Sequence, residues 1–125
     1  MDRFFFVLGS ISAFIGVAVG AFGAHALREK LSPELLNAFE VGVRYQIYHA
    51  LAILAVAWAA SHWLSSNVAV AGWLFFAGTV LFSGSLYALS LTGLRWLGLV
   101  TPVGGLMFLA GWIYAAWVIF RTPVT

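Results

Sequence analysis

Four apolar runs, each long enough to cross a membrane, limit the folds open to this chain more than any other feature. They cover residues 4–27, 45–63, 68–91 and 96–120. About 20 residues of helix cross the hydrocarbon core of a bilayer. Because lipid offers no hydrogen-bond partners, each run must satisfy its own backbone groups, and only a helix does this within one segment. The runs therefore predict an all-α fold, a four-transmembrane-helix bundle.

Composition supports a single integral membrane domain over residues 1–125. The chain is 63% hydrophobic and only 8% charged, whereas about a quarter of the residues of soluble domains are charged. Its six basic residues are scattered and the net charge is only +2, so a nucleic-acid-binding face is not expected. The chain has no cysteine, which excludes disulfides, thiolate catalysis, iron–sulfur clusters and cysteine zinc sites.

A short amphipathic segment at 33–43 connects the first two runs. Ser32 and Pro33 are typical of a helix start, and no proline follows before His62. One helix over residues 33–62 would rise about 45 Å, too long for the membrane alone. We therefore expect 33–43 to be an interfacial helical segment, either a separate helix bent at Gly42 or an extension of the second span.

Small residues recur every fourth position along the first run. They are Ser12, Gly16, Gly20 and Ala24. This spacing lets two helix backbones approach closely in lipid. It predicts a helix-packing stripe, against another span of the same chain or, as the alternative, against a second copy.

Pro102 lies inside the fourth run. A proline in a helix interior frees a carbonyl group and kinks the helix. We expect such a kink at Pro102, because unpaired backbone in lipid is costly. The alternative is a helix that begins at Pro102 with Thr101 as its cap.

Polar residues gather in one half of the predicted bundle. The end of the first run, the start of the second and the end of the third lie on one side of the membrane. The residues concerned are His25, Glu40, Arg44, Tyr45, Gln46, His49, Ser83 and Tyr87. They could line a half-open cavity or a path for protons or small solutes, with His49 titrating near neutrality. The alternative is a hydrogen-bond network that determines which helices are neighbours, each bond contributing about 0.6–2 kcal/mol.

Catalytic and metal-binding patterns are weak. His25, Glu40 and His49 could converge on a metal, but they lack a ligand spacing such as H-E-x-x-H. Ser83, His49 and Glu40 could form a catalytic triad, but no nucleophile elbow surrounds Ser83. We expect no metal, no cofactor and no catalytic residue.

Positive charge predicts the orientation in the membrane. The segments 28–44 and 92–95 contain four basic residues, while the opposite side has Arg3 and Arg121. Basic loops stay in the cytoplasm, so we expect 28–44 and 92–95 inside and both termini outside. Five tryptophans toward the ends of the runs are interpreted as interface anchors: Trp58, Trp63, Trp96, Trp112 and Trp117.

Four motifs in order resemble one family. They are Gly-Ala-Phe-Gly-Ala-His at 20–25, Tyr45-Gln46 with His49-Ala50-Leu51, Phe-Ser-Gly-Ser-Leu-Tyr at 82–87, and Thr-Pro-Val-Gly-Gly at 101–105 with Ala-Gly-Trp at 110–112. Over nearly the whole chain the sequence resembles the YgdD/YwdK-type family of small bacterial inner-membrane proteins, which has eukaryotic relatives. The resemblance implies a four-span protein of the bacterial inner (plasma) membrane and brings no activity, cofactor or catalytic residue.

The functional hypotheses follow from these observations. The first is a non-enzymatic structural, adaptor or lipid-interacting unit that works with membrane lipid, as a homo-oligomer or within a larger membrane complex. The second is a component of a proton or small-solute carrier or channel that uses the polar half-bundle around His49. An intramembrane enzyme is a distant third.

Overall fold

Helices account for all the regular structure in the part of the chain that the structure, a computed structural model, describes: residues 2–123 apart from the side chain of Ala24. In chain order they are α1 (Asp2–Ala18), the π-helical η1 (Val19–Gly23), α2 (Ala24–Leu27), α3 (Pro33–His62), α4 (Ala69–Thr92), the 3₁₀-helical η2 (Arg95–Leu99) and α5 (Thr101–Arg121). The predicted all-α fold is confirmed.

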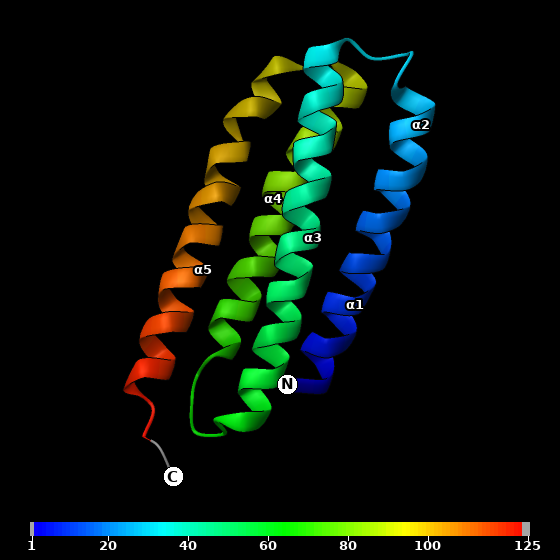
Figure 1. The fold of residues 1–125 in the computed structure, drawn as a ribbon. Coiled ribbons are helices and arrows are strands. Elements are labelled where there is room, and N and C mark those ends of the chain that lie inside the picture. The colour runs from blue at the N-terminus through cyan, green and yellow to red at the C-terminus, as the bar shows by residue number, and fades with distance from the viewer. Residues whose placement is uncertain (1, 124–125) are drawn as a thin grey trace.

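The long helices run up and down in sequence order (Figure 1). α3 packs against α1 on one side and α4 on the other, and α5 packs against α4. The connections at 28–32 and 93–100 lie at one end of the bundle, while α1 begins and α5 ends at the other (Figure 1).

Within residues 2–123, three helical segments are long and apolar enough to cross a membrane: Asp2–Leu27, Ala69–Thr92 and Arg95–Arg121. α3 is more polar because Gln46 and His49 lie in its middle, and both side chains are buried. Its flanking neighbours α1 and α4 cover much of its surface. The polar helix therefore lies inside the bundle, where buried hydrogen-bonding groups find protein partners.

Residues 33–43 are the first three turns of α3. The Ser32 hydroxyl accepts a hydrogen bond from the backbone N–H of Leu35 at 3.2 Å, and Pro33 takes the first helical position. Gly42 continues the helix and is buried, and a Cβ added to it would lie 2.9 Å from the Tyr87 ring. Of the two arrangements expected for this segment, the structure has the extension, because packing against α4 supports the helix beyond the length of a span.

α1 and η1 contact α3 through a row of small residues. Their positions are Gly9, Ser12, Gly16, Gly20 and Gly23. A Cβ added at Gly16 would lie 2.9 Å from Ile47, and one at Gly23 would overlap the Phe39 ring. Ser12, Gly16 and Gly20 of the predicted stripe contact α3, and Gly23 does so as well. The side chain of Ala24, the fourth predicted position, lies outside the described residues.

Pro102 begins a helix instead of bending one. α5 starts at Thr101 with Pro102 in its first turn, and η2 occupies residues 95–99 before it. The predicted kink within a continuous fourth span was therefore wrong. The kink was expected because a helix that begins near Pro102 would, without other structure before it, leave the backbone of the preceding residues unpaired. The 3₁₀ segment supplies hydrogen bonds for that backbone, such as Val100 N–H to Leu97 C=O at 3.0 Å. Thr101 is not the predicted cap, since no side chain caps this helix.

The other half of the bundle has an apolar core. Phe5, Ile53 and Phe75 are fully or almost fully buried there, one from each of α1, α3 and α4. This cluster occupies the end of the bundle nearer the N-terminus of α1. The polar residues are therefore separated from that end by close-packed hydrocarbon.

Candidate functional site

The predicted polar cluster is divided between two sides of α3. Gln46 contacts α1 and α4, whereas His49 contacts α5. Both side chains are buried, at 5% and 4% exposure. The cluster is therefore two separate sites, each beside a different groove.

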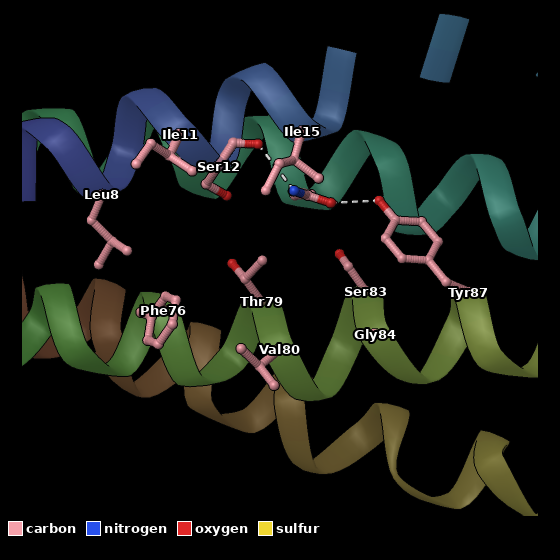
Figure 2. A pocket seen from close by; sticks show the side chains of 11 residues that line it. Leu8, Ile11, Ser12, Ile15, Phe76, Thr79, Val80, Ser83, Gly84 and Tyr87 are labelled. Carbon is pink, nitrogen blue, oxygen red and sulfur yellow. Dashed lines mark hydrogen bonds between the residues drawn. The ribbon is translucent and has the colours of Figure 1, made fainter. Parts of the chain in front are cut away.

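Gln46 connects three helices. Its Nε2 donates to the backbone carbonyl of Ser12 in α1 at 3.0 Å, and its Oε1 accepts from the Tyr87 hydroxyl of α4 at 2.6 Å (Figure 2). Beside it, the Ser83 hydroxyl donates to the Gly42 carbonyl at 2.6 Å. In lipid, where water cannot compete, such bonds specify helix neighbours.

His49 is held in one neutral tautomer. The Trp112 indole N–H donates to His49 Nε2 at 3.1 Å, and an indole nitrogen can only donate. His49 Nε2 is therefore unprotonated, and Nδ1 donates to the Tyr45 carbonyl at 2.8 Å. The imidazole also stacks on the Phe108 ring, with centroids 3.5 Å apart and an angle of 6°.

Two residues of this arrangement have other roles than those the sequence predicted. Trp112 lies in the middle of α5 and connects it to α3, so its interpretation as an interface anchor was wrong. Thr101 hydrogen-bonds to Ser85 of α4 at 2.6 Å. The four-residue spacing of Phe108 and Trp112 is the signal that could have indicated a shared face toward His49.

Together these bonds satisfy the buried polar side chains of the bundle. Within residues 2–123, no buried side-chain nitrogen or oxygen lacks a hydrogen-bond partner. The polar links join α1 to α3, α3 to α4, α4 to α5 and α3 to α5. The arrangement therefore resembles the network expected to determine helix neighbours more closely than the expected path for solutes.

A groove of about 310 Å³ lies between α1 and α4, with Gln46 at its floor. Figure 2 shows Leu8, Ile11 and Ile15 of α1 opposite Phe76 and Val80 of α4. The rim is exposed: Ile11, Ile15 and Val80 are 53%, 44% and 55% exposed. The groove therefore opens sideways, toward the surroundings of the bundle.

Gly84 lies on the wall of this groove and has no packing partner. An added Cβ would have no atom within 4 Å, which is true of no other glycine in the described α-helices. Glycine inside a helix costs about 1 kcal/mol relative to alanine. Contacts within the chain do not account for a glycine here.

A second groove lies between α3 and α5. It has a volume of about 550 Å³ and is lined mainly by rings and aliphatic side chains, with Tyr45, His49, Phe82, Pro102 and Trp112 among them. Nearer the 28–32 end, a separate cavity of about 260 Å³ lies between the start of α3, the end of α4 and η2. Glu34 and Arg95 line this smaller cavity.

The remaining predicted site residues lie apart from these networks. His25 and Arg44 are exposed, and Glu40 is half-buried on α3. No group of three or more His, Asp or Glu side chains within the described residues could hold a metal. Ser83 and His49 bond to different partners on different sides of α3, so the imagined triad is not assembled.

Comparison with known proteins identifies relatives over most of the chain. Residues 19–105 match a family model described as a protein of unknown function, DUF423. The UPF0382 membrane protein YwdK of Bacillus subtilis is 49% identical over 89% of this chain and 91% of its own length. The UPF0382 membrane protein SH2409 of Staphylococcus haemolyticus is 48% identical over 89% and 90%. No solved structure matches.

The matched region contains η1, α3, α4 and the Thr101–Gly105 start of α5. It therefore includes Gln46, His49, Tyr87 and Gly84, the residues around which both grooves are built. Identity near one half extends over 89% of this chain and about nine-tenths of the relatives' length. The chain belongs to the DUF423/UPF0382 family of bacterial multi-pass membrane proteins.

Proposed function

We propose that this protein is a non-enzymatic membrane unit that binds a lipid acyl chain in the groove between α1 and α4. The observation that carries the proposal is the sideways-open groove whose wall contains the unpacked Gly84. Its volume of about 310 Å³ lies at the lower end of the range of ligand sites, roughly 300–1,000 Å³. An acyl chain from the surrounding bilayer would fill the space that a larger residue at position 84 would occupy.

The chemistry of the groove favours a hydrocarbon occupant. Leu8, Ile11, Phe76 and Val80 form its walls. At the floor, Gln46 is engaged by Ser12 and Tyr87. A polar solute would have to replace these bonds in a site without a charged side chain, whereas a lipid chain leaves them intact.

The carrier hypothesis finds less support. A carrier needs polar groups or water along a route through the bundle. Below the polar network, Phe5, Ile53 and Phe75 are almost completely buried, and they occupy the interior along which a solute would have to move.

Photolabelling with a phospholipid that carries a diazirine in its acyl chain tests the proposed site. We expect labels on Ile11, Ile15 or Val80 in the wild type. Gly84→Leu should reduce this labelling by about tenfold, equivalent to ~1.4 kcal/mol of affinity, because the leucine side chain fills the groove. Labelling should be read by peptide mass spectrometry and normalised to Phe14, which is 73% exposed and lines neither groove.

Gly98→Leu is the matched control. Gly98 also has no atom within 4 Å of an added Cβ, but it lies in η2, away from the α1–α4 groove. It should label like the wild type. Equal labelling of the groove in Gly84→Leu and Gly98→Leu would overturn the acyl-chain site.

The orientation remains a prediction with its own test. We propose that 28–44 and 92–95 face the cytoplasm and that both termini face outward, because Arg28, Lys30, Arg44 and Arg95 lie on the former side. The chain has no native cysteine, so single substitutions report cleanly. In intact cells, a membrane-impermeant maleimide should label Ser65→Cys and spare Lys30→Cys; the reverse pattern would invert the topology.

The oligomeric state is also a proposal. We propose assembly as a homo-oligomer or within a larger membrane complex, because large apolar side chains such as Phe14 of α1 and Phe120 of α5 are 73% and 89% exposed. Native mass spectrometry from detergent reports subunit number and retained lipid together. A bare monomer without bound lipid would count against both assembly and the lipid site.

A further inference from the structure

Two cavities lie on one side of the bundle. The upper cavity is the one lined by Glu34 and Arg95, and the lower one is the groove between α3 and α5, farther from the 28–32 connection. On α3, Glu34 and Ala38 line the upper cavity, while Tyr45 and His49 line the groove. These spacings of four, seven and four residues keep all four on one helix face. On α4, Leu89 lines the cavity and Phe82 the groove, seven residues apart and thus again on one face.

The two cavities also differ in polarity: the upper one has charged side chains in its lining and the lower one is lined mainly by apolar side chains, as the two ends of an amphiphile require. The upper one adjoins the first turn of α3 and the start of η2, at the polar end of the bundle. The lower one is lined by Phe82, Pro102 and Leu109. Two turns of α3, about 10 Å of rise, separate Ala38 from Tyr45. A headgroup above and a chain below would follow this gradient.

The upper cavity presents an acid and a base that do not neutralise each other. Glu34 and Arg95 both line it and both are exposed. Within residues 2–123 neither side chain forms an ion pair or a hydrogen bond. A guanidinium group binds phosphate through parallel N–H donors, and a carboxylate attracts an ammonium group. The cavity of about 260 Å³ between them suits a group that bears both charges.

We propose that this side of the bundle binds a zwitterionic phospholipid with a primary ammonium headgroup. Its phosphate lies at Arg95, its ammonium at Glu34, and one acyl chain follows α3 into the groove between Tyr45 and Trp112. The site is separate from the α1–α4 groove and does not depend on the function proposed for it. Charge complementarity selects the headgroup, since phosphatidylglycerol would place an uncharged glycerol at Glu34 and leave its carboxylate without a cation.

Competition between lipids of identical chains tests this proposal. The full-length protein in detergent is titrated with phosphatidylethanolamine, phosphatidylglycerol or diacylglycerol, and bound lipid is counted by native mass spectrometry. We expect phosphatidylethanolamine to bind at least about fivefold more tightly than either competitor. Glu34→Gln should remove the preference over phosphatidylglycerol, and Arg95→Gln the preference over diacylglycerol.

Charge-matched controls separate the site from general surface charge. Arg28 and Glu29 are exposed beyond α2 and line none of these cavities. Arg28→Gln and Glu29→Gln should keep the wild-type lipid order. Equal binding of the two phospholipids by the wild type, or equal effects of Glu34→Gln and Glu29→Gln, would overturn the proposal. Gly84→Leu should leave the preference unchanged, so this site and the acyl-chain site fail independently.

Discussion

Replacing Gly104 with alanine should destabilise the bundle severely, while the same change at the adjacent Gly105 should be tolerated. A Cβ added at Gly104 would overlap the backbone of α4, at 2.8 Å from the Phe82 Cα. A backbone atom in a packed helix cannot move aside as a flexible side chain can, so we expect a loss of about 3 kcal/mol or more. At Gly105 the nearest atom would be a Phe82 ring carbon at 3.8 Å, an ordinary contact.

The measurement is the free energy of unfolding from SDS titration, followed by circular dichroism. The two variants carry the same change in neighbouring positions of one helix, so differences in helix propensity cancel. A gap of about 3 kcal/mol between Gly104→Ala and Gly105→Ala is the expected result. If both variants unfolded at the same SDS concentration, the close approach of α4 and α5 described above would be wrong.

His49→Ala should lower the free energy of unfolding by about 3 kcal/mol. The substitution removes a buried ring stacked on Phe108 and leaves the Trp112 N–H without its acceptor. Large-to-small changes in a core cost about 2–5 kcal/mol. Trp112→Phe is the graded control, since it keeps one aromatic ring but removes the N–H donor together with part of the indole surface, for an expected loss of ~1–2 kcal/mol.

The same pair of variants distinguishes the structural role of His49 from a transport role. A structural role predicts that His49→Ala has the lowest free energy of unfolding, that Trp112→Phe is intermediate, and that the wild type is the most stable. A carrier would instead keep its stability and lose proton or solute flux in proteoliposomes. Unchanged stability together with unchanged flux in His49→Ala would exclude both roles for this residue.

Sequence patterns predicted the polar residues of the site but not their partners. Gln46, His49, Ser83 and Tyr87 were expected in one half of the bundle because of where they fall along the apolar runs. Gln46 and His49 are only three residues apart, and the direction in which each side chain finds a neighbour depends on the placement of α1 and α5. Trp112 and Thr101 were missed as hydrogen-bond partners because no spacing links residues in different helices; the four-residue spacing of Phe108 and Trp112 indicates a shared face of α5 but not the helix that it meets.

Other differences have similar causes. The four-residue stripe predicted a close helix contact and left its partner open; Gly16 and Gly20 pack against Ile47 and Val43 of α3 in the same chain. A proline can lie inside a helix, where it causes a kink, or in the first turn of a helix. The sequence around Pro102 allowed both positions, and only the backbone of residues 95–100 decides which of them occurs. Residues 33–43 continue α3 without a break because Phe39 and Gly42 pack against Tyr87 of α4.

The sequence by itself determined that this chain is a helical membrane protein. Long apolar runs in lipid must satisfy their own backbone, and Ser32, Pro33 and Gly93 determine where helices begin and end through local geometry alone. The tertiary structure decided where the grooves lie and which side chains line them. Whether a glycine meets a neighbouring helix, as Gly104 does, or open space, as Gly84 does, depends on how distant segments approach one another, and that distance is a property of packing that no local pattern contains.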